Sequence, residues 1–402
     1  MTDCRSITTG LNHTPSYGMR RGSFGSSPET LFVSEIHLNG ASARELPAWQ
    51  GAGRLTLGVL RKLGVSTHAA VSMLAKACGC SSGSIGYAGL KDAWATTWQF
   101  VTLSGRVGRV EGSAVSFVPL SGRNTPLSSK EIWGNEFEAR IFNVRSPAEL
   151  IQAFETASRG PLPAFFGPQR FGGFNGDTHL IGHHLLRQEW SAATEAILSG
   201  RNGGYEAALQ DKLAAGQGEA EALLSLPSSL LKLFVNAYQA SVFNRLLQFL
   251  IKSEKWPIYE DPLYLGEVDR FGLPSRTTLS PVSNLTHSLL KTKKLFPMLP
   301  LPGTNLALLK GVAAARVLEL LSQDGVSLAD FRKGPTGEIG GGFRQACFWL
   351  EKASLHSLGN HFLARFNLSR GMYATVALQE ILGGDAVTVG RPGAGSSDAH
   401  GG

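Results

Sequence analysis

The sequence predicts a mixed α/β (α+β) fold in which strands and helices alternate along the chain. Phe137, Ala139 and Ile141 alternate with charged residues at 136, 138 and 140, as expected of a strand with one face in a core. Residues 146–149, SPAE, form a helix start with a capping serine, a proline in the first turn and a glutamate that can reach back to an amide. Residues 228–252 keep apolar side chains at helical spacing, which indicates a long helix.

Other segments fit the same class. Residues 98–103 have the composition of a strand. Ser66 or Thr67 can cap a helix that continues to residue 77. Residues 257–303 are richer in proline, serine and basic side chains, and residues 304–322 have a helical pattern again. The first 27 and last 20 residues are rich in Gly, Ser and Thr, so we expect both ends to be flexible.

Length and composition limit the class of protein. A chain of 402 residues should bury at least two cores. The net charge of +7 favours a polyanionic partner such as RNA, although a merely basic protein has the same balance. Four cysteines show neither zinc-ligand spacing nor a disulfide framework, which fits a reducing cytoplasm. No apolar run approaches the roughly 20 residues of a membrane span. We therefore expect a cytoplasmic protein with no membrane association.

The run GYAGLKD at residues 86–92 contains the strongest candidate for chemistry, Asp92. Its small residues permit a sharp turn, at the end of which the carboxylate would be presented. A carboxylate there can act as a nucleophile or a base, and the adjacent Lys91 would help to keep it ionised. The alternative is structural, because aspartates at the end of glycine-rich turns also serve as helix or turn caps.

The Asp92 run resembles the catalytic motif of the TruD family of pseudouridine synthases. Further pieces of that family's pattern occur in the same order over residues 28–382. They are PETLFVSEI at 28–36, Lys62, Gly64 and Thr67 in a Lys-x-Gly-x-x-Thr segment, GNEF at 134–137, FFGPQRFG at 165–172, NAYQASVFN at 236–244, PLPG at 300–303, and GMYAT at 371–375 with Glu380. Each piece can arise by chance, whereas so many in one order are a strong signal.

The resemblance implies a catalytic pseudouridine-synthase domain at residues 28–187 and 341–382. A second α/β domain of the TRUD type, residues 188–340, would be inserted into it, and the two lobes would form a V. The flexible segments would be 1–27 and 383–402. A basic cleft between two lobes would suit a folded RNA. We expect a monomer that needs no obligatory protein partner.

The resemblance also implies the site. Isomerisation of uridine needs no cofactor and no metal, and Asp92 matches the catalytic aspartate. Lys62 would approach this aspartate and hold its pKa down, unless it is only a surface lysine. Phe166 would stack on the flipped uracil, although a phenylalanine in an aromatic cluster is also an ordinary core residue. Asn135, Gln169 and Arg170 would hold the RNA or order the loop. Tyr373 and Thr375 would pack beneath the site.

Some positions depart from the family pattern. Ala93 replaces a basic residue, Ala164 replaces an asparagine and Phe165 replaces a tyrosine. If the missing amide and hydroxyl bind the polar edge of uracil, each loss would cost about 1–3 kcal/mol. Trp94 and Trp98 are larger than expected and either stack on RNA or fill a core.

Three functions follow. The first is a tRNA pseudouridine synthase, with uridine 13 of the D arm as the leading target. The second is an RNA-binding or tRNA-folding protein that keeps the scaffold but has lost efficient catalysis. The third, a metal hydrolase that uses Asp92 with His183 and His184, is disfavoured. Adjacent histidines on a helix point in different directions, and the sequence offers no carboxylates at ligand spacing.

Overall fold

The computed structural model describes residues 20–172, 176–199, 205–253, 256, 263–383 and 387–388. These residues form two compact units. The terminal unit contains the described residues up to Gly160 and from Trp349 onward, and the central unit contains those from Pro161 to Phe348. The expected limits of the inserted domain, 188 and 340, lie inside the central unit and stay a prediction.

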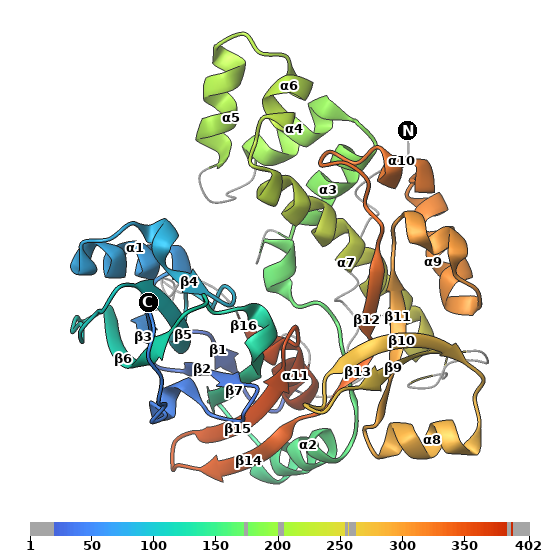
Figure 1. Ribbon diagram of the computed structural model, residues 1–402. Helices are drawn as coiled ribbons and strands as arrows, with labels where there is room; N and C mark the ends of the chain where they lie inside the picture. The colour runs from blue at the N-terminus through green and yellow to red at the C-terminus, as the bar shows by residue number, and fades with distance from the viewer. Residues whose placement is uncertain are drawn as a thin grey trace, which may run out of the picture. The chain divides into compact units, whose positions relative to one another are not determined.

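The terminal unit is built on an eight-stranded sheet (Figure 1). In sheet order the strands are β14 (Glu351–Ser357), β15 (Phe362–Ser369), β7 (Ile132–Ile141), β2 (Leu31–His37), β5 (Thr96–Ser104), β3 (Leu55–Leu63) and β6 (Val115–Arg123), and β4 (Gly86–Tyr87) also pairs with β5. Neighbouring strands are antiparallel except for β2 and β5, which are parallel. This exception places the strand that follows the Asp92 run beside residues near the start of the chain.

Three helices complete the terminal unit, namely α1 (Thr67–Cys78), α2 (Pro147–Arg159) and α11 (Ala374–Leu382). The α1 helix begins at Ser66, whose side chain accepts a hydrogen bond from the Ala69 amide. Its apolar face shares a core with Leu60, Val101 and Phe117 of the sheet. The α11 helix packs against α2. Near the start of the described chain, β1 (Phe24–Gly25) pairs with β16 (Val387–Thr388).

The central unit combines helices with a smaller sheet. Its helices are α3 (Thr178–Leu186), α4 (Trp190–Ser199), α5 (Tyr205–Ala214), α6 (Glu219–Leu224), α7 (Ser228–Lys252), α8 (Asn284–Lys291), α9 (Val312–Gln323) and α10 (Leu328–Arg332). Its four-stranded sheet has the order β10 (Pro274–Ser280), β9 (Leu263–Val268), β11 (Leu295–Leu301) and β12 (Gly342–Gln345), and β8 (Leu162–Pro163) pairs with β13 (Cys347–Phe348). In Figure 1, α4, α5 and α6 cluster away from this sheet.

Helix α7 forms the centre of that unit because all of its side chains from residue 237 to residue 244 are buried, on every face of the helix. Phe234, Tyr238 and Phe243 are buried along it. Helix α3 approaches α7 so closely that a Cβ on Gly182 would lie 2.0 Å from the carbonyl oxygen of Phe234. Only glycine permits this backbone contact. Within the described ranges, no helix has the length and apolarity needed to cross a membrane.

The structure confirms most of the predicted elements. The strands at 98–103 and 136–141 lie in β5 and β7, and the helix over 228–252 is α7. Ser146 caps α2 with Pro147 in its first turn. One expected helix differs, because residues 304–322 divide into a short 3-10 helix, Thr304–Leu308, and α9. Gly311 separates them with a φ of 92°, which interrupts helical geometry.

The two ends of the chain are only partly described. The expected flexible segments fall mainly outside the described residues, so this expectation stays a prediction for them. Phe24, inside the expected N-terminal segment, is 1% exposed. Its strand pairing and burial hold the described part of that segment in place.

Candidate active site

Asp92 lies in the loop that connects β4 to β5, and its side chain is partly exposed. One carboxylate oxygen, Oδ1, accepts a hydrogen bond from the amide of Trp94 at 2.8 Å. This local turn orients the carboxylate relative to its own backbone. The adjacent main chain is also held, because the hydroxyl of Ser26 donates to the carbonyl of Trp94 at 2.7 Å.

The Lys-x-Gly-x-x-Thr motif holds the same loop from the end of β3 and the start of α1. The ammonium of Lys62 donates to the main-chain carbonyls of Asp92 and, at 2.9 Å, of Val65. The amide of Gly64 donates to the carbonyl of Ala95 at 3.4 Å. The hydroxyl of Thr67 accepts from the Lys91 amide at 2.9 Å, and it also donates to the Lys91 carbonyl at 3.4 Å. All three motif residues therefore bind the backbone on one or other side of the Asp92 carboxylate.

Lys62 is buried at the end of β3, opposite Thr97 of β5. Burial lowers its pKa to about 8, although the negative charge of Asp92 raises the pKa and the positive charge of Lys91 lowers it. The lysine therefore approaches the aspartate as expected, but its hydrogen bonds go to the backbone. Among the described residues, no ion pair involves the Asp92 carboxylate.

Lys91 differs from expectation. Its ammonium forms an ion pair with Oε1 of Glu35 at 2.8 Å, so it is not the partner of the neighbouring Asp92 carboxylate. Glu35 is completely buried in β2, and its other carboxylate oxygen accepts from the amide of Phe100 at 2.8 Å. The parallel pairing of β2 with β5 ends at Ser34 opposite Trp98, so the Glu35 carboxylate accepts from an amide that this pairing leaves free.

Sequence reasoning missed the role of Glu35. The signal lay in the alternation along β2. Leu31 and Val33 place buried apolar side chains on one face of the strand, and Glu35 is the next residue on that face. A charge at an inward strand position requires a buried partner. Nothing local in the sequence indicated that this partner is Lys91, because the two residues meet through the parallel pairing of β2 with β5.

Asn135 lies in β7 directly opposite Glu35. The strand register places both on the same sheet face as Lys62, Thr97 and Gln99. Gln99 is completely buried, and its two amide atoms and Oδ1 of Asn135 have no hydrogen-bond partner among the described residues. These five residues form a polar strip across the middle of the sheet, where apolar side chains would be usual.

Phe166, Gln169 and Arg170 belong to the central unit, whereas Asp92, Lys62 and Asn135 belong to the terminal unit. Gln169 is exposed, and it lies with Arg170 in the 3-10 helix Pro168–Phe171. This short helix ends at Gly172, which has a φ of 89°. The surface position of Gln169 leaves it accessible to a ligand.

Phe166 is only 5% exposed. The side-chain amide of Asn244 binds its backbone twice, accepting from the Phe166 amide at 2.8 Å and donating to its carbonyl at 3.0 Å. The guanidinium carbon of Arg344 lies 4.0 Å from the centre of the Phe166 ring, and that of Arg170 lies 5.4 Å from it. The ring of Phe243 meets it edge-on at 5.4 Å. The ring is therefore enclosed by aromatic and cationic neighbours.

Arg344 also reaches Ala164, the position at which an asparagine was expected. Its Nε atom donates to the Ala164 carbonyl at 3.2 Å. Ala164 itself is completely buried. The guanidinium of Arg344, from β12, thus lies next to the position at which the family pattern has an asparagine.

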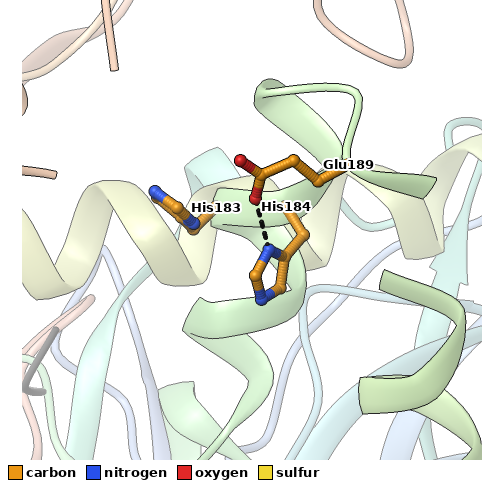
Figure 2. Close-up of side chains that lie close together, drawn as sticks. All are labelled: His183, His184 and Glu189. Atoms are coloured by element: carbon orange, nitrogen blue, oxygen red, sulfur yellow. Dashed lines mark hydrogen bonds and ion pairs between the residues drawn. The ribbon is translucent and has the colours of Figure 1, made fainter. Parts of the chain in front are cut away.

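His183, His184 and Glu189 lie together in the central unit (Figure 2), with one potential ligand atom from each within 4.8 Å of the others. The expectation that no carboxylate accompanies the histidines was wrong, because the chain turns after α3 and returns Glu189 to His184. The two residues are 2.7 Å apart, and Arg187 binds the second oxygen of Glu189 at 2.6 Å. Asp92 is not among the residues of this cluster.

The charges in this cluster favour ion pairs over a metal site. Burial alone would raise the pKa of Glu189, but hydrogen bonds from Arg187 and His184 bring it below its usual value. Burial lowers the pKa of His183, whose Nε2 is 2.9 Å from the carbonyl oxygen of Asp324. Both oxygens of the only carboxylate in the cluster are already engaged, one of them by a guanidinium that would repel a cation.

Comparison with known proteins identifies the fold and the family. The sequence model of the family described as "TruD: tRNA pseudouridine synthase D" matches residues 13–203 and 198–381. The "Probable tRNA pseudouridine synthase D" of Pyrobaculum arsenaticum is 27% identical over 88% of this chain and 90% of its own. The "tRNA pseudouridine synthase D" of Syntrophotalea carbinolica is 25% identical over 90% and 96%.

A solved structure agrees with these sequence matches. The crystal structure of a TruD protein from Methanosarcina mazei superposes with a TM-score of 0.72 at 22% identity, covering 94% of this chain and 97% of that one. This likeness confirms the mixed α/β fold. The family model, which matches nearly the whole length, shows that the chain belongs to the TruD family of tRNA pseudouridine synthases.

Proposed function

We propose that this protein isomerises one uridine of a tRNA to pseudouridine and that Asp92 is its catalytic residue. The observation that carries the proposal is the convergence of Lys62, Gly64 and Thr67 on the backbone around Asp92. A single motif fixes the main chain on both sides of a carboxylate that stays partly exposed. Such a site presents its reacting group in a set position before the substrate arrives.

The reaction conserves atoms, so it needs no oxidant, reductant or cofactor. The bond between C1′ and N1 breaks, the uracil turns, and C5 bonds to C1′. The proton on C5 is then lost and N1 gains one. The Asp92 carboxylate can attack C1′, add to C6 of the base or remove a ribose proton, and these paths stay open.

Phe166 is our proposed stacking partner for the flipped uracil. Its enclosure sets a condition, because the guanidinium of Arg344 or Arg170 must leave the ring before a base can replace it. Gln169 and Arg170 are proposed RNA contacts, and the exposure of Gln169 supports its part. Asn135 is also proposed to hold the RNA or order the active-site loop, although its neighbour across the strands is Glu35.

Uridine 13 in the D arm is the proposed target, and the net charge of +7 suits a polyanion such as tRNA. The names of the relatives, tRNA pseudouridine synthase D, support tRNA as the substrate class. We further propose a monomer without an obligatory partner, located in the cytoplasm. The free thiols of Cys78, Cys80 and Cys347 fit a reducing compartment.

The test is to map pseudouridine at single-nucleotide resolution in total tRNA of the source organism. Wild type is compared with Asp92→Asn, which keeps the side-chain shape but removes the negative charge. We expect one site to be modified by the wild type alone, without added metal or cofactor. Product from the variant at a comparable rate would refute Asp92 as the catalytic residue.

A second candidate is an RNA-binding or tRNA-folding protein without efficient catalysis. The burial of Phe166 and the alanines at 93 and 164 favour it. Salt-sensitive tRNA binding by a wild type that makes no pseudouridine would support this alternative.

A further inference from the structure

Glu35 is an unusual residue for the centre of a sheet. Its side chain is 0% exposed, and it forms an ion pair with Lys91, whose side chain is 11% exposed. Removing two charges from water costs more than their attraction commonly returns, so apolar residues would hold the sheet at least as well. A buried pair beside a reacting group is therefore better explained by what it does to that group.

We propose that Glu35 is a positioning residue that holds the ammonium of Lys91 away from the Asp92 carboxylate and so keeps this carboxylate free for the target nucleoside. The inference rests on the proposed function. It concerns a residue of β2 that belongs neither to the Asp92 loop nor to the Lys-x-Gly-x-x-Thr motif.

Chain connectivity creates the need for such a residue. Lys91 precedes Asp92 directly, and Thr67 binds both the amide and the carbonyl of Lys91. The backbone of Lys91 is therefore fixed beside Asp92, and only the Lys91 side chain can turn toward one carboxylate or another. We expect the Lys91 ammonium without Glu35 to turn to the adjacent Asp92 carboxylate and to block its reaction with the target nucleoside.

Glu35 can direct the ammonium because its own carboxylate is anchored. One oxygen accepts from the Phe100 amide at 2.8 Å, and the other lies 2.8 Å from the Lys91 ammonium. The backbone amide belongs to β5, so it cannot move without the sheet. The position of the glutamate therefore fixes the position of the lysine charge.

The same charge acts on Lys62. Among the described residues, the charged groups that shift the pKa of Lys62 are Asp92, which raises it, and Lys91, which lowers it. Three charged side chains beside one loop are thus coupled, and Glu35 neutralises Lys91, whose charge would otherwise repel Lys62 and attract Asp92. Because of this coupling, removing the Lys91 charge should change the pKa of Lys62, which a purely structural role of the pair would leave unchanged.

The experiment measures single-turnover pseudouridine formation and tRNA affinity for the wild type and three variants: Glu35→Gln, Lys91→Met and the double variant. Glutamine can still accept from the Phe100 amide, but it releases Lys91. We expect Glu35→Gln to lose about 100-fold in rate with an unchanged Kd. Lys91→Met and the double variant should each lose less than about tenfold, because neither has an ammonium that can bind Asp92.

Glu138→Gln is the matched control. Glu138 is 7% exposed in the same sheet and pairs with Arg44 at 3.2 Å and Arg365 at 2.9 Å. Its loss should lower stability but change the rate less than about threefold. Equal losses from Glu35→Gln and Lys91→Met, or a double variant as slow as folded Glu35→Gln, would reduce the pair to a structural role and overturn the inference.

A pH profile keeps the inference testable should Glu35→Gln fail to fold. Lys91→Met removes the cation that lowers the pKa of Lys62, so its alkaline limb should move to higher pH than that of wild type. An unmoved limb would mean that the Lys91 charge does not reach the site, which also overturns the inference. A wild type without product refutes the proposed function and the inference together, whereas an active wild type with a fully active Glu35→Gln refutes the inference alone.

Discussion

The ammonium of Lys62 binds the main-chain carbonyl of Asp92 and leaves the carboxylate of that residue without an ion pair among the described residues. The lysine thus fixes where the aspartate lies while its charge acts from a short distance. This division of roles leaves the carboxylate available to a substrate and makes the site sensitive to the protonation of Lys62.

The first prediction is an alkaline limb in the rate of pseudouridine formation near pH 8. Burial lowers the pKa of Lys62 to about 8, so the ammonium loses its proton as pH rises through that value. The charge-assisted hydrogen bond from Lys62 to the Asp92 carbonyl is then weakened, so the loop is held less firmly and the rate should fall. Single-turnover rates between pH 6 and 9.5 test this, with tRNA affinity measured in parallel. A flat profile across that range would show that the charge of Lys62 is not used.

Thr67→Val tests the backbone contacts of the loop. Valine has nearly the shape of threonine, but it cannot accept from the Lys91 amide, whose hydrogen bond measures 2.9 Å. Loss of a buried partner costs about 1–3 kcal/mol, and we expect this to appear as a rate reduced about tenfold with an unchanged tRNA Kd. Thr156→Val is the control, because its hydroxyl donates to the carbonyl of Gln152 on the exposed face of α2. Equal rates for both variants would exclude a role for Thr67 in holding the loop.

Phe166 requires a substitution that separates stacking from packing. Because the ring is 5% exposed, Phe166→Ala should cost about 3–5 kcal/mol of stability in addition to any loss of base binding. Phe166→Leu keeps most of the volume but lacks the aromatic face. We expect Phe166→Leu to lower the rate at least tenfold with a modest fall in Tm, measured by pseudouridine formation and thermal unfolding. A full rate in this variant would assign Phe166 to the core.

The sequence predicted local elements well because their signals are local. The capping serines at 66 and 146 and the apolar pattern of α7 need no distant partner. The Asp92 loop and the motif that holds it were also both recognisable. The pairing of Lys91 was not, because the parallel contact between β2 and β5 brings Glu35 to it across more than fifty residues. Because Lys91 is adjacent to Asp92 in the sequence, the sequence suggested that these two charges act on each other. In the folded chain, Lys91 forms its ion pair with Glu35 instead.

Gly182→Ala tests the centre of the central unit. The added methyl would lie 2.0 Å from the backbone oxygen of Phe234, so α3 and α7 must separate. We expect a loss of at least about 2 kcal/mol in the free energy of unfolding, measured by denaturant titration. Gly108→Ala has no atom within 4 Å of the added carbon and should leave stability nearly unchanged. Similar stabilities for the two variants would contradict the close packing of α3 on α7.

Glu380 on α11 makes stability depend on pH. Its Oε1 atom is buried without a hydrogen-bond partner among the described residues, and burial raises its pKa from 4.5 to about 7. The folded chain therefore keeps a proton that the unfolded chain releases, so the stabilising contribution is complete below pH 4.5 and is lost as pH rises through 7. Glu380→Gln removes this titration. Relative to wild type, the Tm of Glu380→Gln should rise by about 2–6 °C between pH 5 and pH 8. The exposed Glu45→Gln supplies the control, and a Tm difference for Glu380→Gln that stays constant over this range would mean that the carboxyl is ionised throughout.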